Sequence, residues 1–174
     1  AFYIYKKGAT NEEWNEVHRE FGSALEYLGK DVAIHGNIVV VSATRFNNYT
    51  GKVYIYKTND NGNTWNEVAS FVGATSGSYF GESISIYNNI LVVGACEDDN
   101  GIGTELKGRS YVFKTTDNGD TWSQVAIFDP VDSGKAGDTS GQTTYGGYQF
   151  GKDVSIYEDK LAISAPGDTF GGGL

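Results

Sequence analysis

The stretch TNDNGNTW at residues 58–65 returns as TTDNGDTW at residues 115–122, and a tryptophan closes each copy. An Asp early in such a stretch can accept hydrogen bonds from backbone N–H groups of its own turn, and a Gly can adopt the positive φ that tight turns often need. Thr hydroxyls can close the turn further. The repeat therefore predicts two hairpin turns that satisfy their own polar groups, each covered by a Trp ring. The predicted structural turn residues are Thr58, Asp60, Gly62, Thr64 and Trp65 in the first copy and Thr115, Asp117, Gly119, Thr121 and Trp122 in the second.

The two turns lie inside a longer repeat. YLGKDVAIHGNIVVVSA at residues 27–43 is matched by YFGESISIYNNILVVGA at residues 79–95, and each is followed by a short strand-like segment, the turn and a last apolar segment. Alternating apolar and polar residues predict strands with one buried face, and runs of Ile, Leu and Val predict strands buried on both faces. Two-residue turns join the first strand to the second. Each repeat is therefore predicted to form an antiparallel meander of four strands.

A third repeat is divided between the two ends of the chain. QFGKDVSIYEDKLAISA at residues 149–165 begins it, and AFYIYKKGATNEEWNEV at residues 1–17 matches the second half of the first repeat. Trp14 takes the place of the Trp that closes each turn, although the segment before it lacks the Asp and Gly pattern. We expect this Trp to pack as the others do. We also expect Ala1–Tyr5 to pair as a strand with the segment near Ile163, in the same or a neighbouring chain.

Repeated units of four strands are typical of β-propellers. The predicted fold class is all-β, with blades at 27–71 and 79–128 and a split blade formed by 149–174 and 1–17. Propellers usually have about four to eight blades, because fewer cannot pack into a closed ring. Either the chain is part of a longer propeller, or copies complete one another as a homo-oligomer. Unpaired strand edges predict that an isolated monomer is unstable or sticky.

The repeats resemble the FG-GAP repeat of integrin α-chain propellers and of many extracellular surface proteins. The resemblance implies an extracellular or cell-surface location, and the T-x-D-x-G-x-T-W turns resemble the Asp-box, which lies away from catalytic centres. Each Gly in the matching pairs is expected to let a strand start against its neighbour's backbone. The matching residues are Leu28-Gly29, Phe80-Gly81 and Phe150-Gly151, with Ser42-Ala43, Gly94-Ala95-Cys96 and Ser164-Ala165-Pro166.

Calcium-binding members of the family that the chain resembles carry an Asp/Asn-rich loop between the first two strands of a blade. This chain has two-residue turns there, which cannot supply the roughly six to eight oxygens that Ca²⁺ takes. We therefore expect no cofactor and no firm metal site. The weak calcium candidates are Glu97, Asp98 and Asp99.

Composition narrows the classes of partner. A net charge of -9 with only 13 Lys and Arg residues argues against nucleic acid and anionic membrane surfaces as ligands. No apolar run approaches the roughly 20 residues needed to cross a bilayer. Cys96 is the single cysteine, so an intrachain disulfide is excluded, and a small, semi-buried thiol is expected. Asn48-Tyr49-Thr50 is a possible glycosylation site.

The sequence favours a noncatalytic extracellular module that recognises protein or glycan, or that assembles into an extracellular structure. Suitable polar and stacking groups lie in Phe46–Thr50, Glu97–Gly103 and Thr143–Tyr148. The alternative is a glycan-active propeller enzyme of sialidase type. Such an enzyme needs an arginine triad, and the three arginines, Arg19, Arg45 and Arg109, lie in no recognisable motif.

Overall fold

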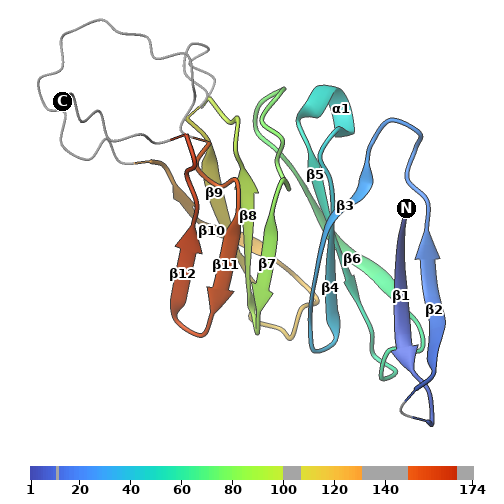
Figure 1. Cartoon of the computed structure of the whole chain (residues 1–174). Helices are drawn as coiled ribbons and strands as arrows, with labels where there is room; N and C mark the ends of the chain where they lie inside the picture. The colour runs from blue at the N-terminus through green and yellow to red at the C-terminus, as the bar shows by residue number, and fades with distance from the viewer. Residues whose placement is uncertain (11, 100–106, 131–148, 168–174) are drawn as a thin grey trace, which may run out of the picture.

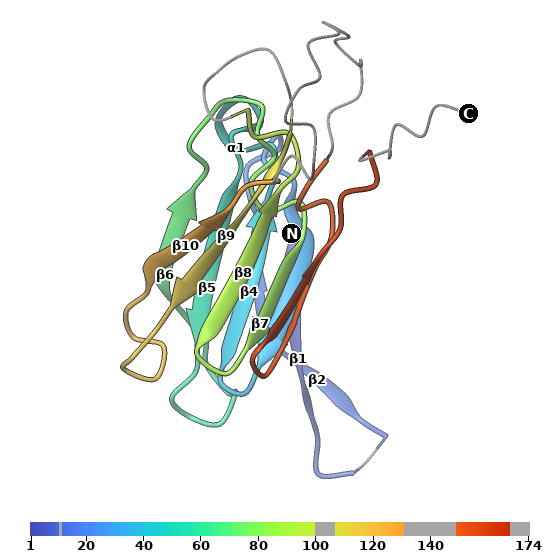
Figure 2. The same cartoon turned by 90° about the vertical axis from the view of Figure 1, so that its left-hand side faces the viewer.

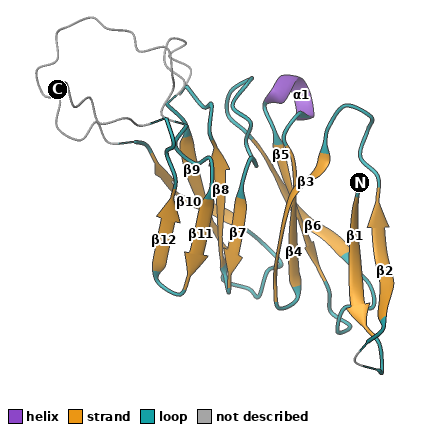
Figure 3. Ribbon diagram, viewed as in Figure 1, coloured by secondary structure: helices purple, strands orange, loops and turns teal. Residues whose placement is uncertain are grey.

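The computed structural model describes residues 1–10, 12–99, 107–130 and 149–167. In this part of the chain almost every regular element is a β-strand, which confirms the predicted all-β class (Figures 1 and 3). The strands are β1 (Phe2–Lys7), β2 (Trp14–Glu20), β3 (Leu28–His35), β4 (Ile38–Ala43), β5 (Lys52–Lys57), β6 (Asn66–Val72), β7 (Ile84–Tyr87), β8 (Ile90–Ala95), β9 (Arg109–Lys114), β10 (Ser123–Phe128), β11 (Val154–Tyr157) and β12 (Lys160–Ile163), and the short α1 (Phe46–Tyr49) follows β4.

The strands form two four-stranded antiparallel sheets and two hairpins. Sheet I has the order β3-β4-β5-β6, and sheet II has the order β7-β8-β9-β10. The N-terminal hairpin is β1–β2, and the C-terminal hairpin is β11–β12. Figure 1 shows the four units side by side, with the N-terminal hairpin beside sheet I at one end and the C-terminal hairpin beside sheet II at the other; Figure 2 shows the same row turned by 90°. The predicted antiparallel meanders are confirmed, while their closure into a propeller remains a prediction.

Short turns join the first and second strands of each repeat where they were predicted. They lie at residues 36–37, 88–89 and 158–159, between β3 and β4, β7 and β8, and β11 and β12. The first residue of each turn has a positive φ: 58° at Gly36, 51° at Asn88 and 54° at Glu158. Gly and Asn adopt this conformation readily, whereas Glu158 does so at a steric cost.

A shared β-bulge shows that the N-terminal hairpin is equivalent to the outer half of each sheet. Val17 is the extra residue between β1 and β2, since Ile4 pairs with His18 and Tyr5 pairs with Glu16. The same irregularity falls at Val68 between β5 and β6 and at Val125 between β9 and β10. Because bulges re-aim the strand that carries them, the three strand pairs share one local twist.

Apolar side chains fill the spaces between neighbouring units. One cluster joins sheets I and II, with Ile38, Val40, Val53 and Ile55 on one side and Phe80, Ile84, Ile86, Leu91, Val93, Ala95, Tyr111 and Phe113 on the other. A second cluster joins the N-terminal hairpin to sheet I, with Phe2 and Ile4 against Leu28, Val39, Val41, Ala43, Tyr56 and Trp65. Each sheet is therefore buried on a face that a flat, isolated meander would expose.

The expected pairing of Ala1–Tyr5 with the segment near Ile163 does not occur within the chain. β1 pairs with β2, and β12 pairs with β11. The N-terminal hairpin is held at sheet I, where the Ala1 ammonium donates to Leu28 O at 2.8 Å. The C-terminal hairpin is held at sheet II, where Val154 N–H donates to Ser83 Oγ at 3.1 Å. Two complete sheets thus separate the two hairpins, and residues 168–174, expected to begin the missing strand, lie outside the described part.

Glycine permits close approach where a strand starts against the neighbouring unit, as expected. Gly29 has a φ of +87°, and a Cβ there would lie 2.4 Å from Ala1 O. Gly151 has a φ of +83°, and its Cβ would lie 2.4 Å from Arg109 O. No side chain fits either position without displacing backbone.

Candidate functional site

The hairpin between β5 and β6, residues 58–65, is closed by its own side chains. Asp60 Oδ1 accepts hydrogen bonds from Thr58 Oγ1 at 2.8 Å and from Thr64 N–H at 2.9 Å. Asp60 Oδ2 accepts from Thr64 Oγ1 at 2.7 Å, and Gly62 N–H donates to Thr58 Oγ1 at 2.8 Å. Gly62 has a φ of +81°. The Asp60 carboxylate therefore accepts the hydrogen bonds that close the turn.

The hairpin between β9 and β10, residues 115–122, repeats this network. Asp117 accepts from Thr115 Oγ1 at 2.8 Å and from Thr121 N–H at 2.9 Å, and Gly119 N–H donates to Thr115 Oγ1 at 2.9 Å. Hydrogen bonds from the backbone and side chain of Thr64 lower the pKa of Asp60 to about 2. The pKa of Asp117 is lowered in the same direction, chiefly by the Thr121 hydroxyl. Both groups are used as ionised acceptors and not as proton donors.

The three tryptophans differ in burial. Trp65 is 8% exposed and lies in the cluster between the N-terminal hairpin and sheet I. Trp122 is half-buried, and its Nε1–H donates to Gly119 O at 3.2 Å. Trp14 is 62% exposed, which contradicts the expectation that it packs like the others. The reason is positional: each of the other two rings lies on the neighbouring unit, and no described unit lies beyond the N-terminal hairpin.

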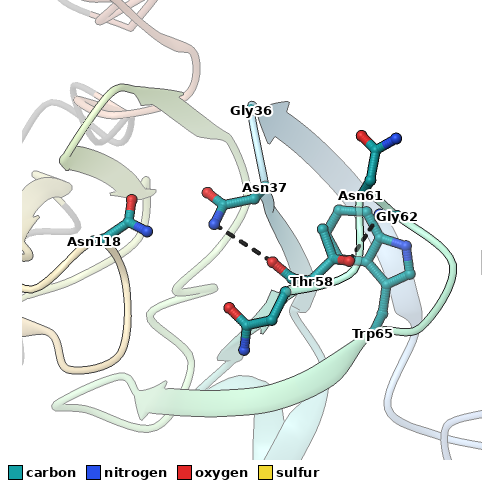
Figure 4. A pocket seen from close by; sticks show the side chains of 8 residues that line it. Gly36, Asn37, Thr58, Asn61, Gly62, Trp65 and Asn118 are labelled. Atoms are coloured by element: carbon teal, nitrogen blue, oxygen red, sulfur yellow. Dashed lines mark hydrogen bonds between the residues drawn. The ribbon is translucent and has the colours of Figure 1, made fainter.

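A hollow of about 580 Å³ lies between the first hairpin and the β3–β4 turn (Figure 4). Asn37 Nδ2 donates to Thr58 O at 3.4 Å across it, and Trp65 forms part of its wall. A second hollow of about 320 Å³ continues toward His35 and Asn118. The lining of the larger hollow is Gly36, Asn37, Thr58, Asn59, Asn61, Gly62, Trp65 and Asn118.

The chemistry of the larger hollow is polar but uncharged. Its described lining includes no titratable side chain, so it supplies neither a general acid nor a general base. Amide side chains can both donate and accept hydrogen bonds. The hollow can therefore hold water or an uncharged polar group, and its residues act mainly to brace the turns against each other.

An exposed aromatic cluster with one cation lies beside α1, at the end of the sheets opposite to the two hollows. The Arg45 guanidinium lies 3.7 Å from the centroid of the Tyr27 ring and 5.7 Å from that of Tyr49. The Tyr49 and Tyr79 rings are 5.3 Å apart. Tyr27 and Tyr49 are 53% and 42% exposed. We call Tyr27, Arg45, Tyr49 and Tyr79 the tyrosine–arginine cluster.

The guanidinium of this cluster has no carboxylate partner among the described residues. The other two arginines do: Arg19 Nε is 3.3 Å from Glu16 Oε1, and Arg109 Nε is 2.5 Å from Asp129 Oδ1. The three arginines thus have three separate environments, on β2, after β4 and on β9. Arg45 alone keeps its planar N–H donors available while its face rests on a ring.

The segment that carries the cluster is strained. Asn47, Asn48 and Tyr49 have consecutive φ values of 47°, 56° and 61°. A left-handed backbone is tolerated by Asn but costs about 1–2 kcal/mol at a residue such as Tyr. Hydrogen bonds hold it in place: Thr50 Oγ1 donates to Asn47 O at 2.6 Å, and Gly77 N–H donates to Asn48 O at 3.1 Å. The α1 segment is therefore a fixed loop and not a regular helix.

Asp98, one of the three weak calcium candidates, has structural partners. Asp98 is 2% exposed and accepts hydrogen bonds from Tyr111 Oη and, at 3.1 Å, from Thr75 Oγ1. Burial, with Asp98 beside it, raises the pKa of the Tyr111 phenol. Among the described residues, which include Glu97 and Asp99, no group of three His, Cys, Asp or Glu side chains could hold a metal ion.

The other residues singled out from the sequence are spread over the molecule. Asn48 is exposed, so the predicted glycosylation site is accessible, but Thr50 of the same motif is buried. Cys96 is 2% exposed, and burial raises the pKa of its thiol to about 11. Of the three predicted recognition segments, Phe46–Thr50 carries the tyrosine–arginine cluster. Residues 100–103 and Thr143–Tyr148 lie outside the described part.

A comparison with family models matches residues 65–113 to the FG-GAP repeat. The matched segment is similar to an FG-GAP repeat. It runs from β6 of sheet I through β7 and β8 to β9 of sheet II, and it contains the Phe80-Gly81 and Gly94-Ala95 pairs. No curated protein matches the chain. In the described part no helix is long and apolar enough to cross a membrane.

Sequence reasoning missed most of the tyrosine–arginine cluster. Tyr27 and Tyr79 hold the same place in two repeats, directly before the Leu-Gly and Phe-Gly pairs, and this periodicity was a usable signal. Nothing in the sequence indicated that Arg45 would stack on Tyr27. That contact joins residues on two different connections of sheet I, which only the fold brings together.

Proposed function

We propose that the chain is a noncatalytic extracellular recognition module of propeller type and that it binds a glycan or protein through the tyrosine–arginine cluster. The observation that carries the proposal is the unpaired Arg45 guanidinium stacked 3.7 Å above the exposed Tyr27 ring. Exposed aromatic rings with a single oriented cation are a common composition for binding surfaces. The similarity of residues 65–113 to the FG-GAP repeat supports an extracellular setting.

The cluster suits a ligand with two chemical features. A carboxylate or sulfate group can accept two N–H hydrogen bonds from Arg45 in a bidentate pair. An apolar ring face, such as one face of a sugar, can stack on Tyr49 and Tyr79, whose centroids are 5.3 Å apart. An acidic glycan carries both features, and a protein loop with an Asp or Glu beside an aromatic residue carries them as well.

The strained loop supports the proposal by pre-organisation. Three consecutive residues with positive φ fix the direction of Tyr49 before any ligand arrives. A ligand that meets a fixed ring does not have to order it, which lowers the cost of binding. Strain that packing and hydrogen bonds maintain at an exposed loop is typical of binding sites.

A glycan array that contains matched neutral, carboxylated and sulfated glycans tests the proposal. We expect binding to acidic glycans, and we expect Arg45→Ala to reduce it at least about tenfold, because one charge-assisted pair is lost. Arg19→Ala is the matched control, since Arg19 already pairs with Glu16. Equal binding by the wild type and Arg45→Ala would contradict the proposed site.

The glycan-active enzyme remains an alternative proposal with little support from the geometry. The three arginines lie in separate environments, with Arg19 and Arg109 paired to carboxylates and Arg45 stacked on Tyr27, which does not favour a carboxylate-binding triad. A fluorogenic sialoside assay distinguishes the two proposals, because only the enzyme releases the fluorophore. We expect no turnover above that of a heat-unfolded sample.

A further inference from the structure

Each of the two hairpin turns contains an Asn-Gly pair, the dipeptide in which the backbone most readily attacks an asparagine side chain. The pairs are Asn61-Gly62 and Asn118-Gly119, and they hold the same place in two repeats. In an unfolded chain the glycine nitrogen can reach the side chain of the preceding asparagine, because glycine has no Cβ to hinder the approach. A third pair, Asn100-Gly101, lies outside the described part.

The reaction of such a pair is a cyclisation followed by hydrolysis. The glycine N–H first loses its proton to a base such as hydroxide. The nitrogen then forms a bond to the side-chain amide carbon of the asparagine, the bond from that carbon to the amide nitrogen breaks, and ammonia leaves with a proton from water. Water finally opens the cyclic imide at either carbonyl and yields aspartate or isoaspartate. The glycine N–H must therefore be free to lose its proton and to approach the side chain.

In the first turn this N–H already has a partner. Gly62 is buried, and its N–H donates to Thr58 Oγ1 at 2.8 Å. Thr58 is 5% exposed, and its hydroxyl donates to Asp60 Oδ1 at 2.8 Å. A hydroxyl donates one hydrogen bond and accepts others, so Thr58 joins the backbone N–H of Gly62 to the carboxylate of Asp60.

The carboxylate at the end of this chain of hydrogen bonds opposes removal of the Gly62 proton. Hydrogen bonds from Thr64 and Thr58 lower the pKa of Asp60 to about 2, so Asp60 is ionised at neutral pH. A deprotonated Gly62 nitrogen would be a second negative charge on the other side of the Thr58 oxygen. Two like charges repel each other, and burial of Gly62 also keeps hydroxide away from its N–H.

The conformation of the turn keeps the asparagine side chain away from this nitrogen. Asn61 has a φ of 59°, and Gly62 has a φ of +81°. Figure 4 shows the Asn61 side chain directed away from the hydrogen bond between Gly62 and Thr58. Cyclisation requires the N–H to leave Thr58 and the side chain to turn back toward it. The turn must therefore open before Asn61 can react.

The second turn has the same arrangement. Gly119 is buried, and its N–H donates to Thr115 Oγ1 at 2.9 Å. Thr115 is 3% exposed, and its hydroxyl donates to Asp117 Oδ1 at 2.8 Å. Asn118 has a φ of 61°. Because the arrangement recurs with the same residue types, it belongs to the turn itself.

We propose that Asn61 and Asn118 are latent deamidation sites, which the hydroxyls of Thr58 and Thr115 keep unreactive while the turns are closed. The two asparagines form part of the wall of the larger hollow, so deamidation would place negative charge on a lining that is uncharged. Isoaspartate would also add a carbon to the backbone and move the glycine N–H away from the threonine. A turn that reacts after opening therefore cannot close as it did before.

Peptide mapping by mass spectrometry tests the proposal on the full chain incubated at pH 8. We expect Asn61 and Asn118 of the folded wild type to react at least about tenfold more slowly than in the same chain in guanidinium chloride, because reaction in the folded chain requires local opening. Thr58→Ala should accelerate the reaction of Asn61 at least about tenfold, since opening is then easier, and should leave Asn118 at its wild-type rate. Thr58→Ser keeps the hydroxyl and is the matched control, which should react as the wild type does.

The second turn separates loss of the hydroxyl from loss of the fold. Thr115→Ala should give the reciprocal result, with fast reaction at Asn118 and an unchanged rate at Asn61. Equal acceleration of both sites by Thr58→Ala would overturn the proposal, because global unfolding would then control the reaction. An unchanged rate at Asn61 in Thr58→Ala would show that the hydroxyl does not protect it. Equal rates in the folded and denatured wild type would show that the closed turn gives no protection.

Discussion

Trp14 and Trp65 hold the same place in two equivalent bulged hairpins, yet Trp14 is 62% exposed and Trp65 is 8% exposed. Trp65 covers the contact between sheet I and the N-terminal hairpin. The sequence that follows is the same, since each Trp begins the motif WNEV. The difference therefore arises from the neighbouring unit, which is present for Trp65 and absent from the described chain for Trp14.

Replacing each Trp by Ala separates these two environments. At concentrations low enough to keep the chain monomeric, Trp65→Ala should lower the free energy of unfolding by about 3–5 kcal/mol, as for a buried aromatic residue. Trp14→Ala should lower it by less than about 1 kcal/mol. Urea unfolding monitored by circular dichroism measures both. Similar losses in the two variants would show that Trp14 is already packed in the monomer.

The lowered pKa of Asp60 predicts how the free energy of unfolding depends on pH. Its pKa is lowered from 3.8 to about 2 by the hydrogen bonds of the turn. A lowered folded-state pKa gives stability that is present above the unfolded pKa and is lost as pH falls through the folded pKa. The destabilisation caused by Asp60→Asn should therefore be full at pH 6 and should shrink between about pH 4 and pH 2.

Urea unfolding of the wild type and Asp60→Asn over that pH range provides the measurement. Asp159→Asn, in the exposed turn between β11 and β12, is the matched control, and it should leave the shape of the pH profile unchanged. A destabilisation by Asp60→Asn that stays constant from pH 6 to pH 2 would mean that the charge of Asp60 does not stabilise the turn.

Alanine substitutions at Gly51 and Gly77 distinguish the cost of backbone strain from the cost of a steric clash, since both residues have a φ of +81°. A Cβ on Gly51 would lie 2.1 Å from Phe80 O, whereas a Cβ on Gly77 meets nothing within 4 Å. Gly77→Ala should cost about 1–2 kcal/mol from the left-handed backbone alone. Gly51→Ala should cost at least about 3 kcal/mol, because sheets I and II must move apart. Equal losses, measured by thermal unfolding, would show that the two sheets do not approach each other at Gly51.

Cys96 should be unreactive in the folded protein. It is 2% exposed, and burial raises the pKa of its thiol to about 11, so very little thiolate is present at pH 8. Iodoacetamide should label it slowly in buffer and fully in urea, with labelling followed by intact mass. Rapid labelling without denaturant would place this residue on an exposed edge.

The sequence repeat was enough to predict the strands and turns. Gly36, Asn88 and Glu158 start turns at the predicted positions, because a turn of two residues is encoded by its own local chemistry. The network around Asp60 follows from residues within one short segment for the same reason. The repeat also indicated that residues 1–17 are the second half of a sheet.

Contacts between units could not be read from the repeat. The stacking of Arg45 on Tyr27 joins two connections that the sequence separates, and no spacing rule relates them. The position of Ala1 could not be predicted either, because it depends on the unit against which the N-terminal hairpin packs. Its hydrophobic residues Phe2 and Ile4 pack on sheet I, so that sheets I and II separate it from the C-terminal hairpin of the same chain.

Amide hydrogen exchange along β12 tests the central claim, that the C-terminal hairpin repeats the β7–β8 pair in the same register. Ser164 N–H donates to Asp153 O at 2.9 Å, so the alternate N–H groups of Leu161 and Ile163 point away from β11. The account predicts slow exchange at Ala162, whose N–H points toward β11. Exchange at Ala162 as fast as in an unfolded segment would contradict it, because the two strands would then not pair in this register.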